Sequence, residues 1–126
     1  MTDLILVVDD DFDIRASLAD VLESEGYSVA LAANGREALT QLETISPQVI
    51  LLDLMMPEMG GAEFLEAFKS LPHRSSPSVI LVLTAASRVD SQGLIQQGVH
   101  EIIHKPVQVD TLLSAVGRAV AAHQSG

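Results

Sequence analysis

The sequence contains no cysteine, and only seven of its 126 residues are lysine or arginine, against seventeen aspartates and glutamates. Without cysteine the chain forms no disulfide, no thiolate metal site and no cysteine nucleophile. The formal net charge of −10 repels the phosphates of nucleic acids and anionic lipids, so we expect no direct binding to nucleic acid or membrane. The first apolar run, Leu4–Val8, is too short for a signal peptide or a membrane span. These absences favour a soluble, cytoplasmic protein.

The sequence does contain enough apolar material for one buried core. Its residues are 48% hydrophobic and 19% charged, a composition that excludes intrinsic disorder. A length of 126 residues suits one domain of ordinary size, and no linker, repeat or low-complexity tract divides it. We therefore predict a single domain over residues 1–126.

Two kinds of segment alternate along the chain. Short apolar runs are separated by stretches in which apolar residues recur with helical spacing. The runs that we predict to be strands are Leu4–Val8, Ser28–Ala32, Val49–Leu52, Val79–Leu83 and Glu101–His104. Because the central runs are apolar without alternation, they indicate strands buried on both faces of a parallel sheet. The strict alternation predicts a doubly wound α/β fold with five strands and five helices.

Two local features concern the helices. Asn34-Gly35 precedes a helical pattern, so we expect Asn34 near the helix N-cap rather than in a hairpin turn. The helix predicted over Val89–Gln97 has Gly93 in its middle, which costs about 1 kcal/mol relative to alanine. We expect that helix to be the least stable of the five.

Reactive side chains follow four of the five predicted strands. Ligands of open α/β sheets bind beyond the carboxyl ends of the strands, so these side chains should share one edge. They are Asp9–Asp11, Asp53, Thr84-Ala85 and Lys105-Pro106. Each alone has an ordinary explanation as a turn residue, a solvated charge or a surface lysine. Together, on one edge, they indicate a functional site.

The chemistry of these residues points to phosphoryl transfer. Clustered carboxylates repel one another unless a cation lies among them, and an all-oxygen site suits a hard ion, above all Mg²⁺. The ammonium of Lys105 and the hydroxyl of Thr84 suit an anion instead. The combination fits a carboxylate nucleophile that attacks a phosphoryl group while cations neutralise the transferring oxygens.

The same residues give the chain a family resemblance over nearly its whole length. LILVVDDD at 4–11, VILLDLMMPEMGG at 49–61, LTA at 83–85 and KP at 105–106 resemble the motifs of response regulator receiver domains in two-component signalling. The resemblance implies a flavodoxin-like sheet in the order 2-1-3-4-5 and phosphorylation of Asp53 by a partner's phosphohistidine. It implies no enzyme beyond the chain's own phosphorylation and slow self-dephosphorylation.

The resemblance also implies a role for each site residue. The implied ligands of Mg²⁺ are Asp10, Asp53 and the backbone carbonyl of Met55, with Asp9 assisting through water. The implied phosphoryl-binding groups are Thr84, the backbone amide of Ala85 and Lys105. Pro57 and Gly61 are expected to shape the loop after the third strand.

The partners follow from the same resemblance. The phosphodonor is expected to be a sensor histidine kinase or a histidine phosphotransfer protein, which meets the first helix around Arg15 and Leu18 and the loop after Pro106. The face formed by the fourth helix, fifth strand and fifth helix is expected to contact an effector domain or a separate output protein.

One position departs from the family pattern. Many receivers carry an aromatic residue three positions before the lysine, where this sequence has Ile102. A β-branched aliphatic side chain is stiff at χ1 and cannot make the same rotamer change. We therefore hypothesise that switching proceeds mainly through the Val89–Gln97 segment.

Other functions stay open or are disfavoured. A receiver-like module that binds partners without phosphorylation is the main alternative, and Ile102 leaves room for it. A Mg²⁺-dependent phosphatase is disfavoured because Met55 stands where such enzymes carry a second aspartate. The segment His100–His104 matches the H-E-x-x-H pattern of zinc proteases. A strand, however, would hold the two histidines about 13 Å apart, too far to share one zinc ion.

Overall fold

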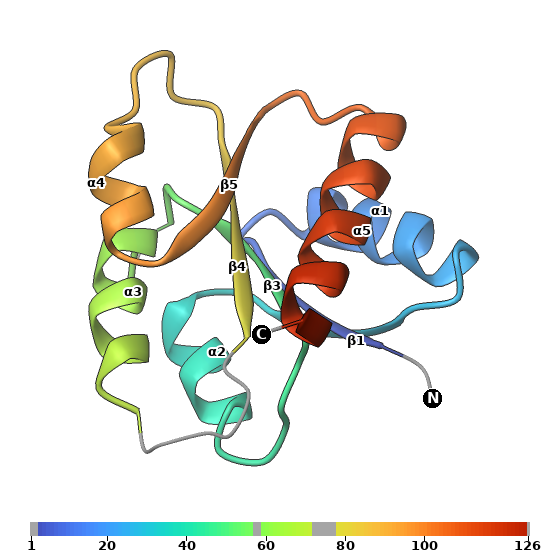
Figure 1. Cartoon of the computed structure of the whole chain (residues 1–126), viewed down its shortest axis with the longest axis horizontal. Helices are drawn as coiled ribbons and strands as arrows, with labels where there is room; N and C mark the ends of the chain where they lie inside the picture. The colour runs from blue at the N-terminus through green and yellow to red at the C-terminus, as the bar shows by residue number, and fades with distance from the viewer. Residues whose placement is uncertain (1–2, 57–58, 72–77, 126) are drawn as a thin grey trace.

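A computed structural model describes residues 3–56, 59–71 and 78–125, so Pro57 lies outside the described residues. Strands and helices alternate along the chain (Figure 1). The strands are β1 (Leu4–Val8), β2 (Ser28–Ala32), β3 (Val49–Asp53), β4 (Val79–Thr84) and β5 (Val99–His104). The helices are α1 (Phe12–Ser24), α2 (Gly35–Gln41), α3 (Gly61–Lys69), α4 (Ser91–Gln96) and α5 (Val109–Ser125).

The strands form one parallel sheet in the order β2-β1-β3-β4-β5. Helices α1 and α5 cover one face of the sheet, and α2, α3 and α4 cover the other (Figure 1). This arrangement confirms the predicted doubly wound, flavodoxin-like α/β fold. It also brings the carboxyl ends of the central strands β1, β3 and β4 next to one another.

The central strands send alternate side chains into two separate apolar cores. Along β3, Val49 and Leu51 pack on the side of α1 and α5, whereas Ile50 and Leu52 pack on the side of α2, α3 and α4. All four side chains are fully buried. Because both faces of the strand are covered, its sequence is apolar at every position from Val49 to Leu52, as the sequence pattern indicated.

Helix α4 is shorter than predicted. It begins at Ser91 because Asp90 is the N-cap, and the Asp90 side chain accepts a hydrogen bond of 2.9 Å from the amide of Gly93. A Cβ atom on Gly93 would lie 2.3 Å from an oxygen of that carboxylate. The glycine that we expected only to weaken the helix therefore also makes room for its cap.

Two turn positions set the limits of neighbouring elements. Gly98 has a φ of 102°, a conformation that glycine adopts without strain. Strand β5 therefore begins directly after it at Val99, two residues before the predicted start. Asn34 is the N-cap of α2, as predicted, and its side chain accepts a hydrogen bond from the amide of Glu37.

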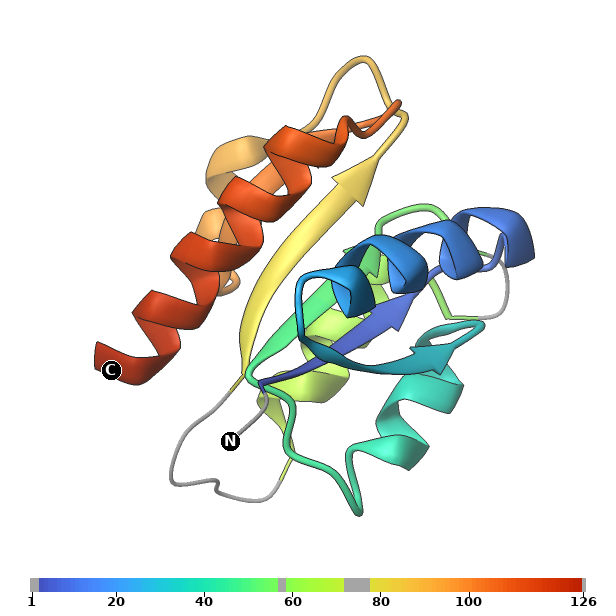
Figure 2. The ribbon, with the colours of Figure 1, turned by 90° about the vertical axis from the view of Figure 1, so that its right-hand side faces the viewer.

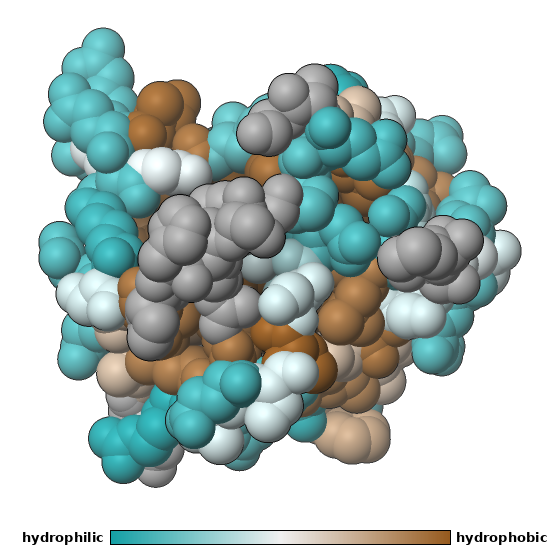
Figure 3. Space-filling view, turned by 60° about the horizontal axis from the view of Figure 1, so that its bottom comes forward, coloured by the Kyte–Doolittle hydropathy of each residue, from teal (hydrophilic) through white to brown (hydrophobic). Residues whose placement is uncertain are grey.

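The two ends of the sheet differ. Helix α5 starts beside the carboxyl ends of the strands and runs back to the opposite end, where β1 begins (Figure 2). Figure 3 shows apolar side chains near the centre of that opposite end, with hydrophilic side chains around them. Among the described residues, no helix combines the length and apolar character needed to cross a bilayer.

Candidate functional site

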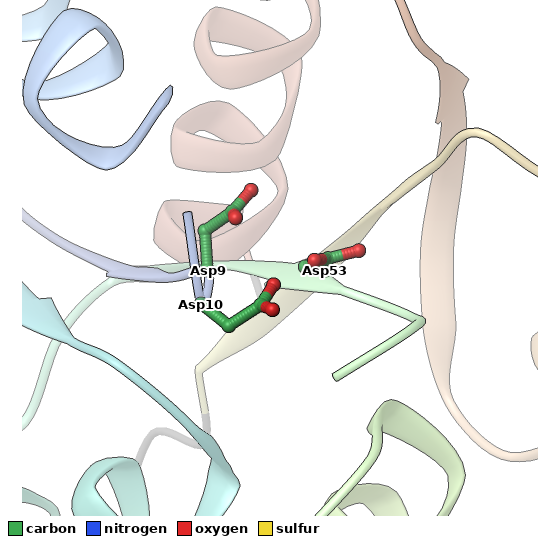
Figure 4. Close-up of side chains that lie close together, drawn as sticks. All are labelled: Asp9, Asp10 and Asp53. Atoms are coloured by element: carbon green, nitrogen blue, oxygen red, sulfur yellow. The ribbon is translucent and has the colours of Figure 1, made fainter. Parts of the chain in front are cut away.

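Three carboxylates meet where β1 and β3 end. Asp9 and Asp10 follow β1, Asp53 is the last residue of β3, and the two strands are neighbours in the sheet. One oxygen of each carboxylate lies within 4.8 Å of the others, and Figure 4 shows the three side chains gathered beside the strand ends. Asp9 and Asp53 are buried, whereas Asp10 is exposed. The structure thus brings together the three aspartates that the sequence suggested as metal ligands.

Lys105 adds a positive charge to this cluster. Its Nζ atom lies 3.1 Å from Oδ2 of Asp9 and 3.7 Å from Oδ1 of Asp53. The backbone amide of Lys105 donates a hydrogen bond of 2.8 Å to the carbonyl of Thr84, so the pairing of β4 with β5 continues to the base of this side chain. The lysine is therefore fixed at its backbone and directed at two buried carboxylates.

Both carboxylate oxygens of Asp9 and its backbone carbonyl accept hydrogen bonds. Its Oδ1 atom accepts a hydrogen bond of 2.9 Å from the amide of Asp11, and its Oδ2 atom accepts one from Lys105. Its carbonyl accepts a hydrogen bond of 2.7 Å from Nη1 of Arg15. From the sequence we expected Arg15 only to contact the phosphodonor. No sequence motif predicted its hydrogen bond to the Asp9 carbonyl across the first turn of α1. Because both Asp9 oxygens are engaged, Asp10 and Asp53 offer the freer oxygens.

Burial raises the pKa of Asp53 from 3.8 to about 6. The hydrogen bond from the Met55 amide to Oδ1 of Asp53, 3.2 Å long, lowers this pKa in part. The charge of Asp9 raises it, the charge of Lys105 lowers it, and a hydrogen bond with Asp10 raises it again. A cation beside Asp53 would offset the cost of burying its negative charge and would lower this pKa.

The donor set of this cluster fits a hard divalent cation. All of its side-chain ligands are carboxylate oxygens, and no histidine or cysteine belongs to the group found among the described residues. Oxygen-only sets of this kind suit Mg²⁺. Asp10 and Asp53 would hold such an ion, with Asp9 behind them. The amide of Met55 is bonded to Asp53, and the role of the Met55 carbonyl as a further ligand stays a prediction.

Thr84 and Ala85 lie at the same edge of the sheet, at the end of β4. Thr84 is fully buried, and its Oγ1 atom accepts a hydrogen bond of 3.0 Å from the amide of Ala86. This bond fixes the oxygen and leaves the hydroxyl proton available to an acceptor. Asp53 pairs in the sheet with Leu83. Thr84, the next residue of β4, therefore lies one position beyond Asp53 toward the carboxyl edge of the sheet. Their phosphoryl-binding roles stay predictions.

A groove opens from the site between α1 and the start of α5. Its volume is about 610 Å³, and its walls are mostly apolar. Lys105 and Ala85 border it, so it adjoins the carboxylate cluster. Its lining side chains come from α1, from the loop that joins β5 to α5, and from α5. They are Asp13, Ile14, Ser17, Leu18, Val21, Pro106, Val107, Val109 and Leu112.

The H-E-x-x-H segment lies in a strand. His100 and His104 both belong to β5 and both are exposed. The strand assignment confirms the prediction on which the zinc protease was rejected, because histidines four residues apart along a strand cannot share one zinc ion.

Comparison with known proteins agrees with this geometry. The profile of the response regulator receiver domain matches residues 5–117. The response regulator MprA of Mycolicibacterium vanbaalenii is 40% identical over 87% of this chain, which spans 47% of MprA. An uncharacterized 14.6 kDa protein of Leptolyngbya boryana is 38% identical, with 89% of this chain and 86% of that protein covered. A CheY-like receiver domain protein of Methanospirillum hungatei JF-1 superposes with a TM-score of 0.88 at 29% identity, covering 99% of this chain and 98% of that one. This chain is a member of the response regulator receiver domain family.

Proposed function

We propose that this chain receives a phosphoryl group on Asp53 from a phosphohistidine and thereby changes the surface that it offers to partners. A carboxylate oxygen of Asp53 attacks the phosphorus atom, and the phosphorus–nitrogen bond breaks with its electron pair left on the imidazole. The product is an acyl phosphate on Asp53. The observation that carries this proposal is that the buried Asp53 has Nζ of Lys105 3.7 Å from its Oδ1 atom and a carboxylate oxygen of Asp10 within 4.8 Å.

The surrounding residues divide the work of transfer. Lys105 is placed to pair with a phosphoryl oxygen, because its Nζ atom already lies beside Asp53. The Thr84 hydroxyl and the Ala85 amide are the donors for the remaining phosphoryl oxygens. Asp10, Asp53 and the Met55 carbonyl are the ligands for Mg²⁺. When bound, Mg²⁺ supplies positive charge that offsets the negative charge of the transferring group.

The groove between α1 and α5 is the place for the phosphodonor. It borders the site at Lys105 and Ala85, so a helix seated in it would bring a histidine next to Asp53. Its apolar walls suit the apolar face of such a helix. The donor is a sensor histidine kinase or a histidine phosphotransfer protein in the cytoplasm. An effector domain or separate protein reads the result.

Phosphorylation is expected to change the amide-exchange protection of the segment 91–97 by at least about tenfold, because α4 is weakly anchored. Leu94 is the one buried residue of α4, and Ile95 is exposed. The Gln97 side-chain oxygen is buried without a hydrogen-bond partner in the described structure. Hydrogen-exchange mass spectrometry with and without phosphorylation measures the change, and Val49–Leu52 of β3 is the internal control. Unchanged protection of 91–97 would contradict a switch through α4.

The proposed chemistry is tested by the intact mass of the protein after incubation with acetyl phosphate. We expect one phosphoryl adduct in the presence of Mg²⁺ and none in excess EDTA. Asp53→Ala should give no adduct, whereas Asp20→Ala, which removes an exposed carboxylate on α1, should behave as the unaltered protein. A lack of adduct under all conditions would refute the proposal and favour a module that binds partners without phosphorylation.

A further inference from the structure

The loop that follows Asp53 is tied down at its start. The amide of Leu54 donates a hydrogen bond of 3.0 Å to the carbonyl of Leu83 in β4, and the amide of Met55 bonds to the Asp53 side chain. The carbonyl of Leu54 in turn accepts a bond of 3.0 Å from the amide of Gly61, the first residue of α3. The two ends of this turn are therefore joined to each other between Leu54 and Gly61.

The far side of this turn rests on the first residue of α2. The amide of Gly35 donates a hydrogen bond of 3.4 Å to the carbonyl of Met59. A Cβ atom built on Gly35 would lie 2.9 Å from Cγ, 3.0 Å from Sδ and 3.0 Å from the carbonyl oxygen of Met59. A Cβ atom does not lie that close to other atoms without a shift, and one of these three atoms belongs to the backbone of Met59. The position therefore has room for glycine and for no larger residue while Met59 stays where it is.

The backbone of Gly35 is not free to yield. The Asn34 side chain accepts a hydrogen bond of 2.9 Å from the amide of Glu37, and the Glu37 side chain accepts one of 2.9 Å from the amide of Ala33. These two bonds tie Glu37 to the two residues before Gly35 and fix the first turn of α2. A side chain added at Gly35 would therefore displace Met59 and not α2.

A shift of Met59 can reach Asp53 through a few neighbouring residues. Gly60 follows Met59, and a Cβ atom on Gly60 would lie 3.6 Å from the carbonyl oxygen of Met56 and 3.8 Å from that of Leu54. Gly60 thus lies close to the carbonyl groups of the two residues that flank Met55. Because Met55 bonds to Asp53 through its amide, a shift passed to Met55 changes the position of the phosphoacceptor.

We propose that Gly35, on a different strand–helix turn from any predicted site residue, is a positioning residue for the metal-binding end of the site. The proposal rests on the function proposed above. By lacking a side chain, Gly35 lets Met59 dock on α2, and this contact sets the path of the turn that carries Met55. The turn thereby positions Met55 and, through the amide of Met55, the side chain of Asp53, which are two of the ligands proposed for Mg²⁺.

Isothermal titration with MgCl₂ tests the proposal on the whole chain. Gly35→Ala is expected to weaken Mg²⁺ binding by about tenfold, in the range seen when residues behind metal ligands are altered. Phosphorylation by acetyl phosphate should then need a higher Mg²⁺ concentration for half-maximal rate, with a nearly unchanged rate at saturating Mg²⁺. A residue that serves only folding would not separate these two quantities.

Three matched variants control for the added methyl group. Gly60→Ala lies in the same turn, where a Cβ atom makes only ordinary contacts, and Gly117→Ala lies in α5, where a Cβ atom meets nothing within 4 Å. Both should bind Mg²⁺ as the unaltered protein does. Gly35→Ala combined with Met59→Ala removes Cγ and Sδ of Met59 from the contact, so it should recover most of the lost affinity.

The outcomes separate this inference from the proposed function. If the unaltered protein neither binds Mg²⁺ nor gains a phosphoryl group, the proposed function is wrong. If it does both and Gly35→Ala binds Mg²⁺ equally well, the inference alone is wrong, and a double variant no better than Gly35→Ala would overturn it too. Should Gly35→Ala fail to fold, Met59→Ile is the second variant, because it places a β-branched side chain against Gly35 from the other side of the same contact. Unaltered Mg²⁺ affinity in that variant would overturn the inference.

Discussion

Lys105→Met should lower the free energy of unfolding by about 3 kcal/mol near pH 7.5 in EDTA, because it leaves a buried carboxylate without its counter-charge. Asp9 is fully buried, and its Oδ2 atom has Lys105 as its ion-pair partner at 3.1 Å. Methionine keeps the apolar stem of the lysine and removes only the ammonium. The loss can be measured by urea unfolding, followed by circular dichroism because the chain has no tryptophan.

The same substitution should slow phosphorylation by acetyl phosphate by about 100-fold or more, the usual effect of losing one group that stabilises charge in a transition state. Added Mg²⁺ should restore part of the lost stability, since it brings positive charge to the same carboxylates. Lys69→Met is the control, because Lys69 forms only an exposed pair with Glu66 at 3.9 Å, of little value to stability. A Lys105→Met protein as stable as the control would show that Asp9 does not depend on this charge.

Asp53→Asn should have the opposite effect and raise the free energy of unfolding by about 2 kcal/mol near pH 7.5 in EDTA. The pKa of Asp53 is raised from 3.8 to about 6, mainly by burial. At about 1.4 kcal/mol per pH unit, this shift sets an upper limit of about 3 kcal/mol. Asp10 beside it is exposed, so screening by solvent reduces the effect. Asparagine resembles the protonated acid and carries no such cost.

The pH dependence of this gain follows from the sign of the shift. Below pH 3.8 Asp53 is protonated in both the folded and unfolded states, so its ionisation costs nothing. Between pH 3.8 and about 6 the unfolded chain releases the proton first, and the folded state loses stability as the pH rises. Above about pH 6 the cost is complete. The difference between Asp53→Asn and the unaltered protein should therefore grow across this window and shrink again when Mg²⁺ is added.

Urea unfolding at several pH values across this window measures the difference. Asp20→Asn is the matched control, because Asp20 lies exposed on α1, where replacement of a surface carboxylate changes stability by less than about 0.5 kcal/mol. A gain for Asp53→Asn that is constant with pH would mean that packing, and not the charge of Asp53, is responsible.

Much of the fold could be predicted because the central strands are buried on both faces. The runs Leu4–Val8 and Ser28–Ala32 coincide with β1 and β2, and reactive residues after four strands pointed to one edge. The ends of α4 and β5 could not be predicted as well. They depend on the bond of the Asp90 side chain to the Gly93 amide and on the positive φ of Gly98, which apolar periodicity does not report.

The supporting contacts of the site were the least predictable part. The bond from Arg15 to the Asp9 carbonyl joins residues six apart across a strand–helix turn. The contact of Gly35 with Met59 joins segments far apart in sequence. Neither leaves a spacing signal, because each depends on how two elements approach in space. Residue types that carry chemistry can be found by their order along the chain, whereas those that hold them in place need coordinates.

Asp53 is the last residue of β3, and helix α5 ends at the opposite end of the sheet, where the strands begin (Figure 2). With 17 residues at about 1.5 Å per residue, it spans about 25 Å. Electrostatic screening in physiological salt acts over about 8 Å, so a charge added at Asp53 is scarcely felt at that distance. A reporter or domain fused after α5 would respond to phosphorylation through a conformational change of the fold and not through the added charge itself. Because it would be attached at the far end of the sheet, it would not block access to Asp53.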